Sequence, residues 1–506
     1  MGQTTIMLML ITIISKIFGF LREAVMASYI GASDLKSIYT TANTLPVVIA
    51  NFVAVGIISG FIPIYNKAKN EEGELAAEEF TSNVLNILMV FAAIAVVLGI
   101  ILARPFSKIL SPDLSGQSLD LATNYTRIMM FAVFAYLYSA VFRGYLNLKG
   151  NFFDPAITGV IMNIIIIGFT ILTGLTQNPY YLIIGALLGN SLQYILFPRA
   201  ARKLGYKHRR ILDIHNKYVR NLMLIAIPII ISSAAGELSI IVDNSMASAF
   251  FGKAAISKFF YSKTMLTLIT GIITISVTTA LFPKIAELGQ AGKIDEMKQR
   301  ISSSVVSTML LIIPASIGMA VLAEPAVSVV FERNAFTSQD TVIVAALIAA
   351  YAPNNIFISV MDVVDRGFYA VGDSKTPVIV VLIQQSVNII FNFVMIKLFG
   401  MVGLAYSTVL ASFVGMILMI YKFRKNFGSI NFKASLISII KISVATAIMA
   451  VVASFTNNFF QGLCPKILAL FVAIIVAMLV YGGLVIFARI PEVMEMINTI
   501  YHKFKK

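Results

Sequence analysis

Residues 15–33 read SKIFGFLREAVMASYIGAS, and they close an apolar run that begins near Ile6. Lys16, Arg22 and Glu23 lie inside this run, where a membrane-spanning helix crosses hydrocarbon. A charged side chain at the centre of a span costs about 2.5–3.5 kcal/mol on insertion scales, so it faces a partner or a water-filled cavity. On a helix the two cations are about 9 Å apart in rise, close enough to contact one anionic ligand. The alternative is that both cationic side chains extend to the nearer membrane interface.

The composition indicates a membrane protein. Of the 506 residues, 58% are hydrophobic and 12% are charged, and the mean hydropathy is +0.88. Soluble domains carry about 25% charged residues, so most of this chain is expected to lie in lipid. The net charge is +15, but the basic residues fall in short connectors between apolar runs. This distribution argues against nucleic acid as a partner and indicates a membrane surface.

The remaining reactive residue types argue against an enzyme. The single Cys464 cannot form an internal disulfide, and the three histidines, His208, His215 and His502, lack the spacing of zinc ligands. A transferase or phosphatase acting on lipid would need a nucleophile, a base or a metal cluster, and the expected spans contain no such constellation. We therefore expect that the chain is not an enzyme.

The apolar runs predict about fourteen transmembrane helices, each near the ~20 residues that a bilayer requires. Every second connector is basic, and the longest basic connector covers residues 199–220. The alternate connectors, of which residues 31–36 form the first, are poorer in cations. By the positive-inside rule, this alternation places both termini in the cytoplasm and requires an even number of spans. The predicted fold is all-α and multi-pass.

An internal repeat predicts two six-helix lobes. RGY at 143–145, followed by a glycine and a proline, recurs as RGF at 366–368 with the same followers, about 220 residues later. FIP at 61–63 and LFP at 281–283 repeat at nearly the same offset. A repeat of six spans keeps one orientation in both halves, and such parallel repeats place substrate near the midplane between halves that move against each other.

The repeat divides the chain into three parts. Residues 1–210 form the expected N-terminal lobe, residues 211–427 the C-terminal lobe, and residues 428–506 two extra helices with a cytoplasmic tail. The basic segment at 199–220 is then the linker between the lobes.

Polar side chains also interrupt the later spans. Lys263 opens the eighth expected span, where it is either an interface anchor or a ligand contact. Asp243 lies deep in the seventh, where a carboxylate indicates a cation site or a proton-linked switch. Asn388 and Asn392, one helical turn apart, could supply neutral oxygens to the same cation. Hydrogen bonding between helices is the alternative role of these two amides.

Several strings resemble the MurJ/MviN family of lipid II flippases, in the multidrug/oligosaccharidyl-lipid/polysaccharide exporter superfamily. Besides residues 15–33, the strings are TLP at 44–46, FIPIY at 61–65, LNLKGNFFDPA at 146–156, ALFPKIAELGQAGK at 280–293, ERNAFTSQDT at 332–341 and DRGFYAVGDSKTPV at 365–378. The resemblance runs from about residue 15 to residue 427. It implies two six-helix lobes around a cationic cavity, plus two C-terminal helices that line a hydrophobic groove for a lipid tail. The implied function is movement of the undecaprenyl-pyrophosphate-linked peptidoglycan precursor from the inner to the outer leaflet by alternating access, for cell wall synthesis.

The resemblance assigns substrate binding to three cations: Lys16, Arg22 and Lys263. Arg22 matches a family arginine, whereas the two lysines stand where the family typically has arginines and therefore lack the bidentate fork. It also implies a sodium site at Asp243, Asn388, Asn392 and Thr408. Asn392 aligns with a family carboxylate, which weakens that site, so either Na⁺ or H⁺ is the expected coupling ion. We expect no other cofactor.

Four further positions depart from the family pattern. They are Ser37, Ala50, Asn51 and Val55, which replace an aspartate, a pair of arginines and a glutamate. These departures leave open a flippase for another polyprenyl-pyrophosphate glycan of capsule, O-antigen or teichoic type. A drug/cation antiporter is disfavoured, because it would need acidic residues in the first lobe. The expected partners are the lipid-linked substrate and membrane lipids, with no nucleic acid, and the chain is expected to be a monomer.

Overall fold

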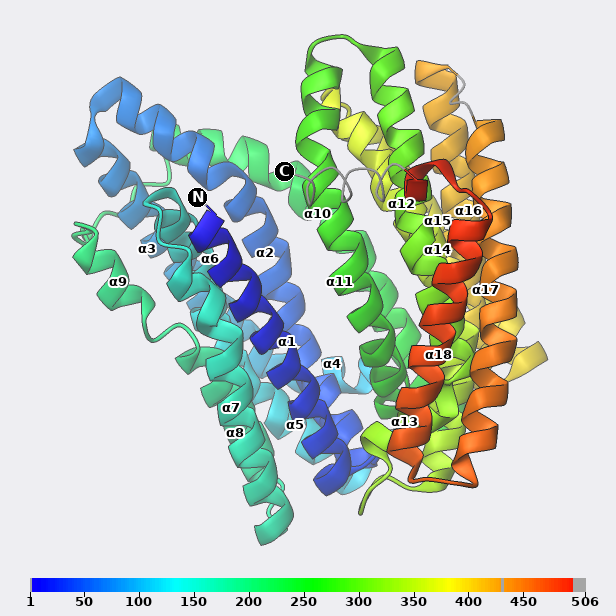
Figure 1. The fold of residues 1–506 in the computed structure, drawn as a ribbon. Coiled ribbons are helices and arrows are strands. Elements are labelled where there is room, and N and C mark those ends of the chain that lie inside the picture. Colours follow the sequence, from blue (N-terminus) through cyan, green and yellow to red (C-terminus); the bar gives the residue numbers. More distant parts are fainter. Residues whose placement is uncertain (1, 429–431, 495–506) are drawn as a thin grey trace. The chain divides into compact units, whose positions relative to one another are not determined.

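A computed structural model describes residues 2–428 and 432–494, and the regular structure within those ranges is α-helical (Figure 1). The chain forms two compact units. The first comprises Met1–Ser257 and Arg333–Thr337, and the second comprises Lys258–Glu332 and Ser338–Lys506. The prediction of an all-α fold is confirmed.

The helices follow one another through the two units with short connections, except for the longer segment at residues 204–216 between α9 and α10. The first unit contains α1 (Gly2–Ile30), α2 (Asp34–Glu72), α3 (Glu74–Ile101), α4 (Ala103–Leu110), α5 (Gly116–Met130), α6 (Ala132–Leu148), α7 (Phe153–Thr176), α8 (Tyr180–Leu192), α9 (Phe197–Lys203) and α10 (Lys217–Phe251). The chain then continues through α11 (Ala255–Gln290), α12 (Ile294–Val321), α13 (Ala323–Phe331), α14 (Ser338–Ala370), α15 (Lys375–Phe399), α16 (Met401–Phe427), α17 (Phe432–Gln461) and α18 (Lys466–Phe487).

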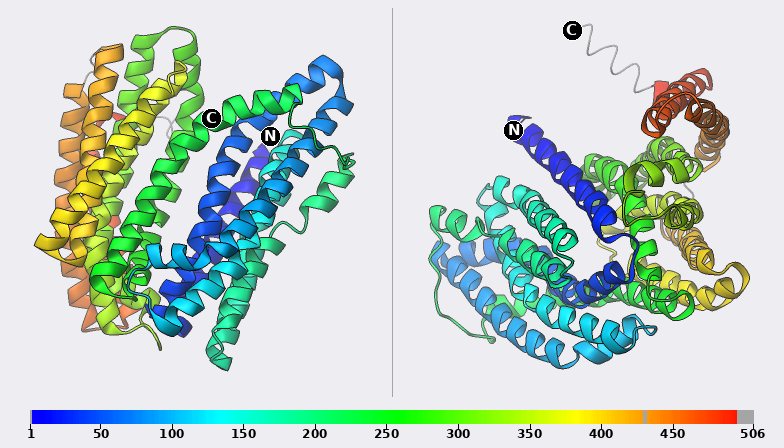
Figure 2. Two further views of the ribbon diagram at one scale, coloured as in Figure 1. Left: turned by 180° about the vertical axis from the view of Figure 1, so that it is seen from behind. Right: turned by 90° about the horizontal axis from the view of Figure 1, so that it is seen from below.

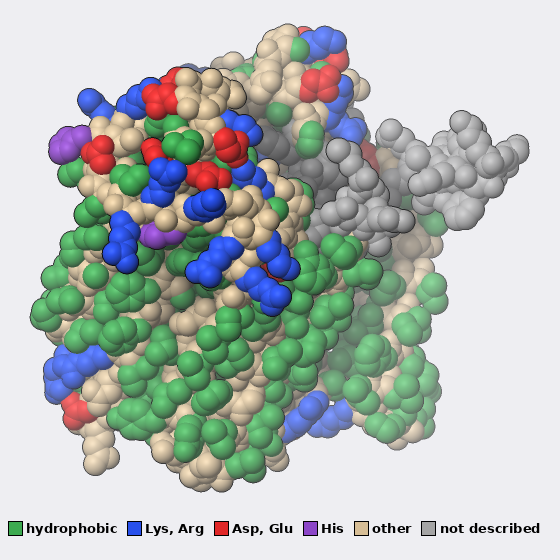
Figure 3. All heavy atoms as spheres, turned by 90° about the vertical axis from the view of Figure 1, so that its left-hand side faces the viewer, with side chains coloured by type: hydrophobic (Ala, Val, Ile, Leu, Met, Phe, Trp, Pro, Cys, Tyr) green, Lys and Arg blue, Asp and Glu red, His purple; other side chains and the backbone are tan. Residues whose placement is uncertain are grey.

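Helix length and surface both fit a membrane. Within the described residues, 11 segments are long and apolar enough to cross a bilayer. Helices α1, α10 and α11 are not among these segments. They are 29, 35 and 36 residues long, which is more than the ~20 that a span requires. On the face of the first unit in Figure 3, hydrophobic side chains form a broad band beside a cluster of charged and histidine side chains. The chain is a multi-pass membrane protein. These helices are consistent with about fourteen spans, and the exact number stays a prediction.

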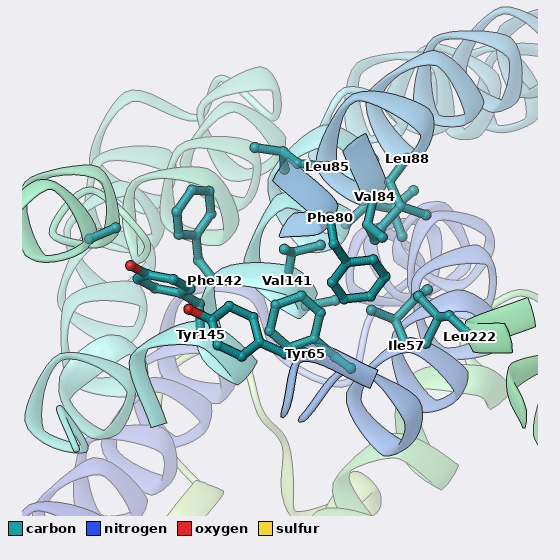
Figure 4. Packing of buried hydrophobic residues seen from close by; sticks show 14 of the residues in the cluster. Ile57, Tyr65, Phe80, Val84, Leu85, Leu88, Val141, Phe142, Tyr145 and Leu222 are labelled. Atoms are coloured by element: carbon teal, nitrogen blue, oxygen red, sulfur yellow. The ribbon is translucent and has the colours of Figure 1, made fainter. Parts of the chain in front are cut away.

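The core of the first unit explains which helices belong to it. Tyr65, Phe80, Tyr145 and Leu222 come from α2, α3, α6 and α10, and they lie together in Figure 4. The rings of Tyr65 and Tyr145 meet edge to face, with centroids 6.1 Å apart, which is a favourable arrangement for aromatic pairs. Because α10 packs along α2, the first unit extends to Ser257. The division at residue 210, which rests on the repeat, stays a prediction.

The two copies of the repeated motif end in the same backbone turn. Gly150 and Gly372 have φ of +81° and +80°, a left-handed conformation that glycine adopts without steric cost. In both copies the next N–H bonds back to a carbonyl five residues earlier, at 2.8 Å from Asn151 and 2.9 Å from Asp373. The sequence repeat therefore corresponds to a repeated local structure. The symmetry of the whole lobes stays a prediction.

A second glycine in each copy allows an aromatic ring to approach the helix. A methyl group at Gly144 would lie 2.8 Å from the ring of Phe61 in the first unit. A methyl group at Gly367 would lie 2.6 Å from the ring of Phe423 in the second unit. Both rings are fully buried, so the repeated RG dipeptide places a close helix contact in each unit.

The two C-terminal helices pack on the second unit. Helix α17 lies along α12 and against α18, and the two last helices, orange and red, run side by side in Figures 1 and 2. The Tyr481 hydroxyl of α18 donates a hydrogen bond to the Leu310 carbonyl of α12 at 2.6 Å. The part of the chain expected to lie outside the repeat is thus anchored to α12.

We expect Gly144→Ala and Gly367→Ala each to destabilise the protein by about 1–3 kcal/mol, because the added methyl overpacks a buried ring. Gly168→Ala is the matched control, since a methyl there meets nothing within 4 Å and alanine favours the helix. Thermal unfolding of the detergent-purified variants measures the difference. Equal midpoints for all three variants would show that the ring contacts tolerate a methyl group.

Candidate functional site

The carboxylate of Glu23 is the centre of the candidate site in the first unit. It lies on α1 and is 2% exposed. Arg22 donates to its Oε1 from Nε at 3.0 Å and from Nη2 at 2.7 Å. Lys36 donates to its Oε2 from Nζ at 2.9 Å. Two cations share one carboxylate, so the cluster keeps a net positive charge.

Sequence reasoning missed Lys36, which it assigned to a cation-poor connector outside the membrane. The structure corrects this assignment: Lys36 lies in the first turn of α2, behind the N-cap Ser33, and is 0% exposed. Its Nζ is 2.7 Å from the Met26 sulfur and 5.2 Å from the centroid of the Tyr39 ring. A buried ammonium persists only with an anionic or π partner. The charge of Glu23 inside an apolar run was the signal that could have indicated this third cation.

Arg22 and Lys16 occupy different environments on α1. The side chain of Arg22 is 20% exposed, and two of its N–H groups hold Glu23. Lys16 is partly buried, and within the described part of the chain it has no hydrogen bond or ion pair. Helix α1 packs along α7, where Asn163 donates to the Ser15 carbonyl at 3.3 Å. Helix α1 therefore carries one cation in an ion pair, Arg22, and one, Lys16, that has no ion-pair partner among the described residues.

Lys263 belongs to the second unit. Its Nζ lies 5.5 Å from the centroid of the Tyr351 ring, a distance typical of a cation–π contact. Nearby Lys258 forms an ion pair with Asp340 at 3.3 Å. An aromatic partner favours a fixed position for Lys263 over a side chain extended into the membrane interface. Its convergence with Lys16 and Arg22 stays a prediction.

Three of the four expected sodium ligands lie in the second unit. Asn388 and Asn392 are buried on α15, and the Asn388 amide donates to Thr408 Oγ1 of α16 at 3.2 Å. Asp243 is buried on α10, in the first unit. The described residues contain no group of three or more His, Cys, Asp or Glu side chains that could hold a metal ion. The sodium site stays a prediction.

Two of the positions that depart from the family pattern have defined partners inside the first unit. Ser37 Oγ accepts a hydrogen bond from the backbone N–H of Ser257 at 3.0 Å. Asn51 donates from Nδ2 to Glu237 Oε1 at 2.8 Å. The serine therefore holds α2 against the start of α11, and the asparagine holds α2 against α10.

An apolar cavity of about 280 Å³ lies in the second unit among α12, α14, α16 and α17. Met309, Val360, Met416 and Ile439 are among the side chains that line it. A cavity of this character accepts hydrocarbon and offers almost no polar partner. One wall comes from α17, and none of the lining residues that the structure describes comes from α18; the groove lined by both C-terminal helices stays a prediction.

The fold and these features define a class: a multi-pass helical membrane transporter with a buried cationic cluster and an apolar cavity. Within this class the chain belongs to the lipid II flippase MurJ family, because the sequence model of that family matches residues 26–475. The resemblance of the quoted strings to that family is confirmed.

The relatives support this assignment. The chain is 26% identical over 483 residues to a probable lipid II flippase MurJ of Bdellovibrio bacteriovorus, covering 94% of this chain and 92% of the relative. It is 27% identical over 521 residues to a protein of the same name from Synechocystis, covering 98% and 96% of the two chains.

Solved structures show the same fold. A lipid II flippase MurJ in an inward closed conformation matches with a TM-score of 0.82 at 24% identity, covering 96% of this chain and 99% of that one. An inward-facing multidrug resistance MATE family transporter of the MOP superfamily matches with a TM-score of 0.68 at 14% identity, covering 83% and 96%. Both matches show that the fold is shared.

We expect Glu23→Gln to destabilise the protein by about 3–5 kcal/mol, because it leaves two cations without their buried carboxylate. Combining it with Lys36→Met should recover much of that loss, since the most deeply buried cation is then absent. Lys67→Met is the control: Lys67 is half-exposed, its ion pair with Glu71 spans 3.9 Å, and such pairs contribute about 0–1 kcal/mol.

Thermal unfolding midpoints of the three variants and the double variant measure this coupling. Additive effects of Glu23→Gln and Lys36→Met would contradict the interaction between the two side chains.

Proposed function

We propose that this chain moves lipid II, the undecaprenyl-pyrophosphate-linked precursor of peptidoglycan, from the inner to the outer leaflet of a bacterial cytoplasmic membrane for cell wall synthesis. The observation that carries the proposal is the family match over residues 26–475. The buried cations of the first unit and the apolar cavity of the second suit a substrate that has an anionic centre and a hydrocarbon tail. The chain acts as a transporter of this substrate and not as an enzyme on it.

Arg22 is the residue best suited to the pyrophosphate. Its guanidinium holds Glu23 with two N–H groups, and its side chain is 20% exposed. An arriving pyrophosphate competes with Glu23 for these donors, and charge-assisted bonds from a planar fork match phosphate oxygens. Lys36 remains on the other carboxylate oxygen at 2.9 Å, so Glu23 keeps a partner when Arg22 turns to substrate. Lys36 is therefore a positioning residue that lowers the cost of that exchange.

Lys16 and Lys263 complete the proposed anion site. Mutual repulsion among buried cations is relieved by a multiply charged anion, which gives the site its substrate dependence. Lys16 lacks an ion-pair partner among the described residues, so it needs no exchange before it contacts phosphate. Lys263 brings the corresponding cation from the second unit, held beside Tyr351.

The hydrocarbon tail is assigned to the apolar cavity bordered by α17. Its lining of methionine and branched aliphatic side chains adapts to a long flexible chain. Access alternates between the two membrane faces as the halves of the parallel repeat move against each other. The identical glycine turns of the two copies support this repeat.

A coupling ion is proposed for the return step. Asp243 supplies the carboxylate, and Asn388, Asn392 and Thr408 supply neutral oxygens; an ion that binds one conformer better shifts the equilibrium by that difference. The asparagine at 392 in place of a carboxylate favours weak sodium selectivity or proton coupling.

Arg22→Ala should weaken lipid II binding by roughly ten- to a hundredfold, because a charge-assisted hydrogen bond contributes about 1.5–3 kcal/mol. Lys16→Arg and Lys263→Arg should be tolerated, since arginine keeps the charge and adds the fork. Binding to the purified variants and growth of a strain depleted of its own lipid II flippase provide the two measurements.

If the Arg22→Ala variant binds lipid II and supports growth normally, these cations do not form the substrate site. Failure of the parent chain to support growth, with normal expression, would favour another polyprenyl-pyrophosphate glycan as the substrate.

Asp243→Asn should abolish the dependence of transport on sodium concentration or on pH, because the substitution removes the only carboxylate of the proposed ion site. Transport by the parent and the variant is compared in vesicles across sodium concentrations and pH values. Identical profiles for the two proteins would leave Asp243 without a role in coupling.

Both termini are assigned to the cytoplasm on the basis of the alternating basic connectors. In a Cys464→Ser background, cysteines at the exposed positions Ser115 and Gly462 should react with an impermeant thiol reagent outside intact cells. A cysteine at His208, also exposed, should react only after the membrane is opened. Labelling of position 208 in intact cells would show that the assigned orientation is wrong.

A further inference from the structure

A polar cavity of about 450 Å³ lies in the second unit, away from the residues assigned to substrate or coupling ion. It is bordered by α13, by the start of α14, and by the adjoining ends of α17 and α18. Glu324, Glu332, Asn457, Gln461 and Lys466 are among its lining side chains. Two carboxylates face one ammonium group there, so the lining carries a net negative charge.

Glu332 forms a fixed wall of this cavity. Its two oxygens accept hydrogen bonds from the Ser338 hydroxyl at 3.0 Å and the Thr341 hydroxyl at 2.8 Å. Burial opposes its ionisation, but hydrogen bonds led by that of Thr341 keep the pKa of Glu332 below its ordinary value. Lys466 lies 3.7 Å from the carboxylate and donates to Ser328 Oγ at 3.2 Å. The charge of Glu332 is thus balanced from within the protein.

Glu324 and Asn457 lack such partners. Glu324 lies in the first turn of α13, is exposed, and forms no ion pair with any residue in the described ranges. Asn457 is 3% exposed, and its Oδ1 accepts no hydrogen bond from the described part of the protein. A buried acceptor left unpaired costs about 1–3 kcal/mol. A half-turn of the carboxamide exchanges its oxygen and nitrogen, which lets Oδ1 meet a donor in the cavity.

We propose that this cavity binds the primary ammonium of an ethanolamine phospholipid headgroup. The ammonium donates N–H groups to Asn457 Oδ1 and to the Glu324 carboxylate, and the neighbouring phosphate lies beside Lys466. An anion without an ammonium would meet the two carboxylates, and a sugar hydroxyl would leave the charge of Glu324 uncompensated. A bare metal ion is too small for the volume and would find only two carboxylate ligands in the lining.

The surroundings of the cavity favour a lipid as the carrier of the ammonium. Helices α17 and α18 are both apolar enough to span a membrane, and the cavity lies at the ends where they adjoin. Phe455, Phe459 and Leu463, on the same stretch of chain as Asn457, are strongly exposed hydrophobic side chains. A phospholipid whose headgroup occupies the cavity would lay its acyl chains against such a surface.

The test compares headgroups by their N–H groups. The full-length protein, purified in detergent, is titrated with phosphatidylethanolamine, with phosphatidylcholine, whose nitrogen carries no hydrogen, and with phosphatidylglycerol, which has no nitrogen. Thermal unfolding gives the apparent affinity for each lipid. Phosphatidylethanolamine should stabilise the protein at concentrations at least tenfold lower than the other two.

Asn457→Ala and Glu324→Gln should each remove this preference, whereas Asn70→Ala, at an exposed position of the first unit, should keep it. Glu324 is exposed, so Glu324→Gln folds and carries the test even where Asn457→Ala does not. Water-soluble glycerophosphoethanolamine is the second arm, and it should stabilise much more weakly than the lipid.

Three results would overturn the proposal. The first is equal stabilisation by phosphatidylethanolamine and phosphatidylcholine. The second is an ethanolamine preference that survives Glu324→Gln. The third is stabilisation by glycerophosphoethanolamine as strong as that by the lipid, which would make the ligand a soluble amine.

Discussion

One buried carboxylate sets the electrostatics of the first unit. Glu23 holds Arg22 on one oxygen and Lys36 on the other, in a part of the chain where an isolated charge would be strongly unfavourable. The pairing ties the last turns of α1 to the first turn of α2, and it leaves the cluster with an excess positive charge. The same interaction that permits burial of these cations therefore preserves the positive charge on which the proposed anion site depends.

The second unit supplies the apolar counterpart. Its C-terminal helices are attached through α12, by side-chain packing and by the hydrogen bond from Tyr481 to the Leu310 carbonyl. This attachment creates the apolar cavity along α17 and, at the other ends of the same helices, the polar cavity around Asn457. A headgroup bound there would hold a membrane lipid beside helices that also border the proposed path of a lipid tail.

Repetition in the sequence corresponds to repeated backbone geometry. Gly150 and Gly372 adopt nearly the same left-handed φ, and Gly144 and Gly367 each admit a buried aromatic ring close to a helix. Such positions can be predicted from the sequence because only glycine satisfies them. The packing of α10 on α2 cannot be predicted in this way, because it depends on side chains such as Leu222 whose partners are distant in the chain.

The sequence by itself determined the fold class and the family, because apolar run length and the RG motifs depend on local properties of the chain. It also predicted that Arg22 and Lys16 are charges inside a span. Only the tertiary structure decided that Glu23 is shared by two cations and that Lys36, expected in a connector, is buried. The pairing joins residues 13 positions apart on two helices, and the burial of Lys36 results from their packing, which no local pattern encodes.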